Sequence, residues 1–186
     1  MTEPTTATTE ATAAPPRELR VEGAGAMLGL LDYGEPGGAE SPLPAGSGTD
    51  PRGGAPAPPV AGGAEVALLL HGIRDLAWSM DSVARALRVR YRVLSFDLRG
   101  HGASDHPGVY TFLHYAADLH RALDSLAIDS ATFIGHSLGG QVVCTYAGLF
   151  PERARAVVTI EGLGPPRPPG DDPVEERRAQ VKGRKG

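Results

Sequence analysis

Short apolar runs alternate with stretches of helical periodicity through the middle of the chain. Four runs have the apolar character of strands buried on both faces of a sheet: residues 66–70, 91–96, 131–135 and 156–160. Between them, apolar residues recur three and four positions apart, which predicts helices over residues 80–87, 112–126 and 139–150. Strands joined by helices of this length pair in parallel through right-handed crossovers, so the pattern predicts an α/β fold.

The segments around this pattern differ from it in composition. Residues 1–16 are rich in Thr, Ala and Glu and lack the features of a secretory signal, which predicts a disordered lead-in. Residues 17–33 have the pattern of a hairpin. About half of residues 34–64 are Gly or Pro, which predicts a flexible insertion without secondary structure. A Pro-rich, charged tail follows over 166–186, so the folded domain is expected within residues 17–165.

Composition excludes several classes of protein. No apolar run approaches the roughly 18 residues that a membrane span requires. Cys144 is the single cysteine, so an internal disulfide framework is excluded. The net charge of −4 gives no footprint for nucleic acid. No pair of histidines has a convincing zinc-ligand spacing. We therefore expect a cytoplasmic protein without a metal, another cofactor, a nucleic-acid partner or a membrane partner.

The sharpest chemical signal lies between a predicted strand and a predicted helix. The segment Gly135-His136-Ser137-Leu138-Gly139 matches the G-x-S-x-G pattern, in which a serine occupies a strained turn above the edge of a sheet. The two glycines are needed because side chains at their positions would clash in so tight a turn. The helix behind Ser137 directs free N–H groups at the site, and the N–H of Leu138 is the expected first oxyanion donor.

Two further motifs follow the first two predicted strands of the alternating region. The sequence His71-Gly72-Ile73 follows the first, where the N–H of Ile73 is a candidate second oxyanion donor. The sequence D-L-R-G-H-G-A-S begins at Asp97, after the next strand. We interpret it as a structural turn in which Asp97 and Arg99 bond to each other or to nearby backbone.

The order of these three motifs resembles the α/β-hydrolase fold family, and in particular its lipase, esterase and serine-hydrolase-like members. The resemblance implies a mostly parallel sheet of about eight strands, of which this sequence supplies about six. It also implies Ser137 as a serine nucleophile, with Leu138 and Ile73 as oxyanion donors. A dehalogenase of the same fold would carry Asp at position 137, so that branch of the family is disfavoured.

The family's catalytic acid and base are harder to place. In this family the base is a histidine after the last strand, but no histidine follows His136 here. Among the earlier histidines, His101 is the first candidate to approach the site. A minority of members place the acid after the sixth strand, where Glu161 stands. Glu161 is either that acid or a carboxylate at a strand end without a catalytic role.

Two functions remain open at this point. The first is a serine hydrolase that cleaves an ester, lactone or related small carbonyl substrate through an acyl-enzyme, in a chain truncated before the catalytic histidine. The second is a catalytically inactive fragment or pseudo-hydrolase that needs a partner chain for completion. In either case, residues 156–160 would form an exposed apolar edge strand through which the chain could self-associate.

Overall fold

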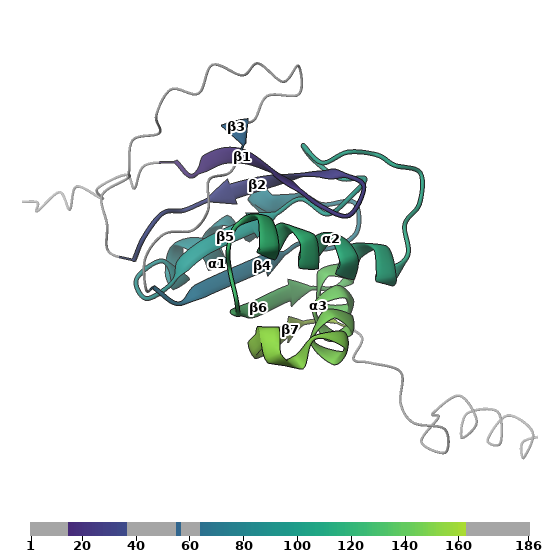
Figure 1. Ribbon diagram of the computed structural model, residues 1–186. Coiled ribbons are helices and arrows are strands. Elements are labelled where there is room, and N and C mark those ends of the chain that lie inside the picture. Colours follow the sequence, from purple (N-terminus) through teal and green to yellow (C-terminus); the bar gives the residue numbers. More distant parts are fainter. Residues whose placement is uncertain (1–14, 37–54, 57–63, 163–186) are drawn as a thin grey trace, which may run out of the picture.

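A computed structural model describes residues 15–36, 55–56 and 64–162 (Figure 1). In this part of the chain, seven strands form one sheet in the order β3-β1-β2-β5-β4-β6-β7. The strands are β1 (Arg17–Glu22), β2 (Met27–Asp32), β3 (Ala55–Pro56), β4 (Val66–Leu70), β5 (Arg92–Phe96), β6 (Ala131–His136) and β7 (Ala154–Ile160). Strands β5, β4, β6 and β7 run parallel, whereas β2 is antiparallel to both β1 and β5. The predicted α/β class and mostly parallel sheet are therefore confirmed.

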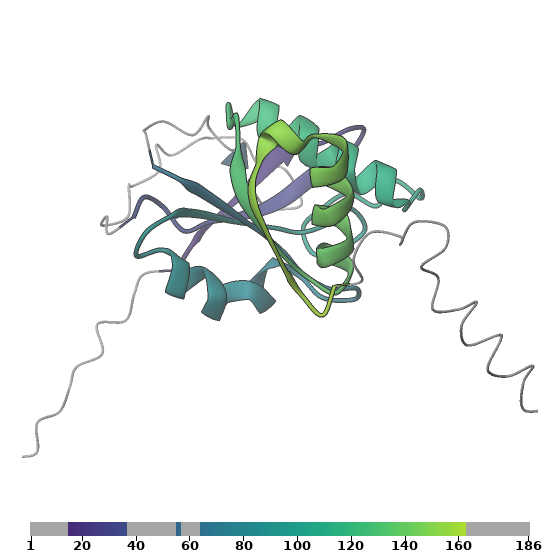
Figure 2. The same cartoon turned by 90° about the horizontal axis from the view of Figure 1, so that it is seen from below.

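Helices cover both faces of this sheet. They are α1 (Asp81–Leu87), α2 (Phe112–Ser125) and α3 (Leu138–Leu149), with short 3₁₀ turns η1 (Ala77–Met80) and η2 (Pro151–Arg153). Helices α2 and α3 lie on one face and α1 on the other (Figures 1 and 2). Successive residues of β4 divide between the two cores: Leu68 packs in the core under α2 and α3, and Leu69 packs in the core under α1. This two-sided burial explains why β4 has no polar alternation.

The start and end of the helices follow the sequence signals. Thr111 caps α2 as expected, because its side chain accepts a hydrogen bond from the His114 N–H. The predicted inner face of α2 is buried, including Tyr115 and Leu119. Helix α3 ends at Leu149, two residues before Pro151, which cannot continue the hydrogen-bonded pattern of a helix interior.

The segment over residues 34–64 differs from its prediction at one place. Ala55 and Pro56 form β3, which pairs in parallel with Leu19 and Arg20 of β1, so the prediction of no secondary structure is wrong there. A proline is compatible with an edge strand, where its missing N–H need not face the neighbouring strand. Residues 37–54 and 57–63 of the predicted loop lie outside the described residues. The same is true of residues 1–14 of the predicted lead-in and of the whole predicted tail.

Strand β7 forms the opposite edge of the sheet. It pairs with β6 along one side, and no described residue pairs with its other side. Its apolar side chains are accessible, with Val158 48% exposed and Ile160 39% exposed. The interior strands β4 and β5, in contrast, are buried along their whole length.

Candidate active site

The sequence motifs meet at one edge of the sheet because β4, β5, β6 and β7 are parallel. His71 directly follows β4 and Asp97 directly follows β5. Ser137 follows β6 and Glu161 follows β7. Ligands of open α/β sheets bind outside the carboxyl ends of the strands, which is the edge where these residues gather.

Ser137 occupies the strained turn between β6 and α3. Its backbone has φ +49° and ψ −109°, a conformation that residues other than glycine rarely adopt. The turn is held by two backbone hydrogen bonds: Ser137 N–H donates to the Ile160 carbonyl at 2.8 Å, and Gln141 N–H donates to the Ser137 carbonyl at 3.1 Å. The strain is therefore carried by the surrounding structure, which places Ser137 at the exposed end of the strand.

The two glycines of the motif are required by close backbone contacts. A Cβ atom on Gly135 would lie 2.3 Å from the Gly139 carbonyl oxygen. A Cβ atom on Gly139 would lie 2.3 Å from the Leu70 carbonyl oxygen. Both neighbours are backbone atoms and cannot rotate away, so the turn and the start of α3 pack as closely as they do only without side chains there.

The turn after β4 lies directly against the serine turn. A Cβ atom on Gly72 would lie 2.9 Å from His136 Nδ1 and 3.5 Å from Ser137 Cβ. The Gly139 N–H donates to the His71 carbonyl at 3.1 Å, which joins the two segments. The structure thus brings the H-G motif and the G-x-S-x-G motif together, although 64 positions separate Gly72 from His136 in the sequence.

Two backbone N–H groups beside Ser137 have no acceptor among the described residues. Leu138 is the first residue of α3, where a helix leaves its N–H groups without an intrahelical partner. Ile73 follows the glycine that packs against Ser137, and its side chain is 66% exposed. The positive end of the α3 dipole adds to the preference of this region for negative charge.

No histidine in the described part of the chain accepts a hydrogen bond from Ser137 Oγ, although all six histidines are described. His101 bonds backbone through both ring nitrogens: Nε2 accepts from the Arg74 N–H at 3.2 Å, and Nδ1 lies 3.0 Å from the Arg99 carbonyl oxygen. The ring of His136 packs on Gly72. The other four are His71, which bonds backbone at the end of β4, His106 in an exposed loop, and His114 and His120 on α2.

Glu161 lies beside the serine turn through its backbone. The preceding residue, Ile160, accepts the Ser137 N–H, and a Cβ atom on Gly140 would lie 2.7 Å from the Cα of Gly162. Glu161 itself has φ +53° and an exposed side chain. Its carboxylate bonds to no described group, although its backbone lies at the same edge of the sheet as Ser137.

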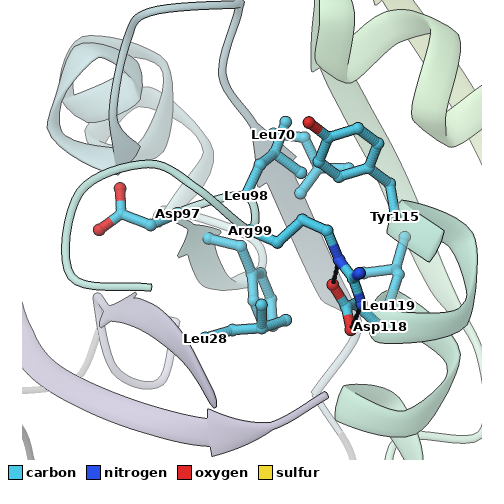
Figure 3. Close-up of a pocket in the computed structure, with 9 residues that line it drawn as sticks. Leu28, Leu70, Asp97, Leu98, Arg99, Tyr115, Asp118 and Leu119 are labelled. Atoms are coloured by element: carbon cyan, nitrogen blue, oxygen red, sulfur yellow. Dashed lines mark hydrogen bonds and ion pairs between the residues drawn. The ribbon is translucent and has the colours of Figure 1, made fainter. Parts of the chain in front are cut away.

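The turn after β5 bonds to nearby backbone, as expected, and also to a residue of α2 that was not expected. Asp97 accepts backbone N–H groups from Ala77 at 2.6 Å and Ala103 at 2.8 Å, so its bonding to nearby backbone is as predicted. Arg99 donates to the Val109 carbonyl oxygen at 3.0 Å, also as predicted. It does not bond Asp97 but points away from it and forms a two-pronged ion pair with Asp118 of α2, at 2.5 and 2.7 Å (Figure 3). The role of Asp118 was not predicted from the sequence. The signal was an acidic residue on the otherwise apolar inner face of α2.

His71 is the other polar residue buried at this edge. Its Nδ1 lies 2.6 Å from the Gly72 carbonyl oxygen, and its Nε2 accepts the Leu98 N–H at 3.0 Å. Burial lowers the pKa of the His71 ring from its ordinary value of 6.5, so the imidazole is neutral at pH 7.

Two hollows lie near this edge of the sheet. One is too small for a substrate, and the other is not lined by Ser137. One, of about 10 Å³, lies between the β5 turn and α2, with Leu70 and Tyr115 in its wall (Figure 3). It has room for about one water molecule. The other, of about 200 Å³, lies between β1, β2 and the η1 turn, with Trp78 in its wall. Ser137 lines neither of them.

The described ranges contain neither a group of potential metal ligands nor a membrane-spanning helix. Across residues 15–36 and 64–162, no three His, Cys, Asp or Glu side chains converge as a set of metal ligands. None of the helices described is long and apolar enough to cross a bilayer.

Comparison with known proteins finds a family model and several hydrolases that match this chain. A family model described as alpha/beta hydrolase fold matches residues 66–184. An sn-1-specific diacylglycerol lipase of Xenopus tropicalis is 35% identical over 111 residues, which cover 59% of this chain and 33% of the relative. The esterase YbfF of Escherichia coli is 35% identical over 94 residues, which cover 50% of this chain and 37% of the relative. The chain thus spans about a third of the length of these curated relatives.

A solved structure extends the match to the fold. The crystal structure of epoxide hydrolase A from Mycobacterium thermoresistibile superposes with a TM-score of 0.62 at 32% sequence identity. The alignment covers 89% of this chain and 45% of that protein.

Proposed function

The chain belongs to the alpha/beta hydrolase fold family, and on that premise we propose that Ser137 is the nucleophile of a serine hydrolase acting on small ester, lactone or related carbonyl substrates. The observation that carries the proposal is the Ser137 turn. The turn combines a strained backbone, a serine Oγ that bonds to no described group, and two nearby N–H groups without an acceptor among the described residues. Such an arrangement suits attack on a carbonyl carbon.

In this mechanism Ser137 Oγ attacks the carbonyl carbon, and the carbonyl oxygen becomes an oxyanion. The N–H groups of Leu138 and Ile73 donate hydrogen bonds to that oxygen and stabilise its charge. The oxyanion then collapses, the bond from the carbonyl carbon to the alcohol oxygen breaks, and the base passes the Ser137 hydroxyl proton to that oxygen. Water hydrolyses the resulting acyl-enzyme, which releases the carboxylic acid and restores the Ser137 hydroxyl. The lipase and esterase relatives support a carbonyl substrate, and the choice among esters and lactones depends on the residues that cover the site.

The base is the component that the described residues do not supply. None of the six histidines bonds to Ser137 Oγ, and the sequence contains no histidine after His136. We propose that the base comes from a segment that adds to the sheet along the outer side of β7, where Glu161 stands ready as a candidate acid. That segment would belong either to a longer form of this chain or to another polypeptide.

A second candidate function follows from the same edge. Without the completing segment, the chain would be an inactive member of the family that awaits a partner chain. The open side of β7 favours this alternative, since an unpaired apolar strand is a template for a further strand. Both candidates share the same nucleophile turn and differ in whether Ser137 is activated in this chain alone.

Labelling with a fluorophosphonate probe separates the two candidates. Rapid labelling that disappears in Ser137→Ala would show an activated serine, and His101→Gln would then test the first candidate base. Absence of labelling above the Ser137→Ala control, on protein with cooperative thermal unfolding, would establish the inactive alternative. In subtilisin, loss of a triad member leaves about 10³- to 10⁴-fold catalysis over water, so the two outcomes differ widely in rate.

The open edge also supports pairing between two copies of the chain. We expect the mass measured by light scattering to rise with protein concentration, and Val158→Lys to abolish that rise because a charge on an edge strand opposes pairing. Val89→Lys is the matched control, since Val89 is an exposed valine away from β7. A wild-type mass that stays monomeric at every concentration would contradict self-association.

A further inference from the structure

His71 is a fully buried polar side chain that the proposed mechanism does not use. His71 directly follows β4, and its ring reaches the segment after β5, where it bonds Leu98. A buried imidazole is costly unless both nitrogens are bonded, and here both are. The directions of these two bonds connect His71 to the oxyanion site.

The bonding partners determine which nitrogen carries the proton. Nε2 accepts the Leu98 N–H at 3.0 Å, so Nε2 has no hydrogen of its own. The hydrogen of the neutral ring is therefore on Nδ1, which donates it to the Gly72 carbonyl oxygen at 2.6 Å. The other groups that face the ring are Asp97, with Oδ1 4.0 Å from Nε2, and the His101 ring at 5.0 Å.

The Gly72 carbonyl and the Ile73 N–H belong to one peptide group. The described chain has no cis peptide bonds, so this C=O and this N–H point in opposite directions. The sheet order places β4 between β5 and β6, and the His71 ring reaches toward β5. With its carbonyl drawn to the ring, the peptide directs the Ile73 N–H away from β5, toward the side of β6 and Ser137.

We propose that His71 is a positioning residue that fixes the Ile73 N–H as an oxyanion donor through its hydrogen bond to the Gly72 carbonyl. The inference rests on the proposed function, because an oxyanion donor matters only if Ser137 attacks a carbonyl. The two ring nitrogens of His71 then have different roles. The bond to Leu98 anchors the ring to β5, and the bond to Gly72 sets the orientation of the donor.

Two substitutions separate these bonds. His71→Asn places an amide nitrogen near the position of Nδ1, so it retains the donor to Gly72 and loses the acceptor for Leu98. His71→Gln places an amide oxygen near the position of Nε2, so it retains the acceptor for Leu98 and loses the donor to Gly72. The variants introduce the same functional group, each loses one hydrogen bond, and they differ by one methylene.

The first readout is the rate of labelling of Ser137 by the fluorophosphonate. We expect His71→Asn to stay within about threefold of wild type and His71→Gln to fall by about 10- to 100-fold, which is less than deleting an oxyanion donor outright. Thermal unfolding of both variants is the control for a general loss of structure. Equal rates in the two variants would overturn the proposal.

The second readout is independent of activity. We expect the ¹⁵N relaxation order parameter of the Ile73 amide to stay near ~0.85 in wild type and His71→Asn, and to fall below about 0.6 in His71→Gln. An Ile73 amide as rigid in His71→Gln as in wild type would overturn the proposal. If wild type is not labelled at all, Ser137 is not activated in this chain alone, as the inactive alternative expects, and this readout still decides the positioning role.

A third measurement needs no variant. The ¹⁵N chemical shifts of the His71 ring in the wild-type protein report which nitrogen is protonated. We expect a protonated Nδ1 and an unprotonated Nε2. A ring protonated at Nε2 would overturn the proposal, even if His71→Gln failed to fold.

Discussion

The ends of β5 and β6 lie on the same edge of the sheet, and their polar groups are bonded in opposite ways. After β5, the Arg99 guanidinium is 2% exposed and bonds Asp118 and the carbonyls of Val109 and Ala24. After β6, Ser137 Oγ bonds to no described group, and the backbone that carries it is strained. One strand end is a bonded scaffold and the other holds a group left free to react.

The difference follows from the cost of burial. A buried charge must be paired, because the alternative is an uncompensated charge in a medium of low polarity. A nucleophile must keep its oxygen accessible, and a strained turn is one way to present it. Substitutions after β5 should therefore destabilise the fold, whereas substitutions at Ser137 and Glu161 should leave it unchanged or stabilise it.

The largest effect is expected at Arg99. Arg99→Ala leaves the Asp118 carboxylate buried without its partner, and we expect a loss of about 3–5 kcal/mol in the free energy of unfolding. Urea denaturation measures this loss. The matched control is Arg121→Ala, because the Arg121–Glu22 ion pair is exposed and such pairs contribute about 0–1 kcal/mol. An Arg99→Ala loss as small as the control would contradict the scaffold role.

A smaller loss is expected at Asp97. Asp97→Ala removes the acceptor of the Ala77 N–H, which is buried, and of the Ala103 N–H, which lies at an exposed residue and can bond water. We expect a loss of about 2 kcal/mol, the typical cost of one unsatisfied buried donor. Asp97→Asn keeps one acceptor oxygen and should lose less. Urea denaturation of both variants tests this order. An Asp97→Ala variant as stable as wild type would contradict it.

At Ser137 we expect a substitution to raise stability instead of lowering it. Ser137→Gly relieves the strain of the positive φ, but the glycine makes the unfolded chain more flexible, which offsets part of that gain. We expect a net increase of about 1 kcal/mol in the free energy of unfolding. Ser137→Ala retains the strain and serves as the control, with stability close to wild type. The melting temperatures of the two variants measure the difference. Equal melting temperatures would show that the turn stores no strain.

The smallest effect is expected at Glu161. Glu161→Gln removes a charge from an exposed side chain that bonds to no described group, so we expect an unchanged melting temperature. Glu161→Gly is the informative partner variant, since Glu161 also has a positive φ. A clear destabilisation by Glu161→Gln would show that the carboxylate is bonded and belongs with the scaffold.

Local sequence patterns determined the elements of the fold and the turn at Ser137. The apolar runs predicted the four parallel strands to within two residues at their starts, and Thr111 and Pro151 marked the limits of helices. The glycines around Ser137 predicted a turn too close for side chains, because the constraint acts between residues a few positions apart. The order of these motifs was enough to predict the family.

Only the tertiary structure decided which distant residues bond one another. Arg99 and Asp118 lie 19 positions apart, and His71 and Leu98 lie 27 positions apart, on segments whose patterns do not depend on each other. The pairing of β3 with β1 likewise brings together Ala55 and Leu19, which lie 36 positions apart. Hydrophobic periodicity records which face of an element is buried, whereas a hydrogen bond between two elements requires their relative placement, which packing alone supplies.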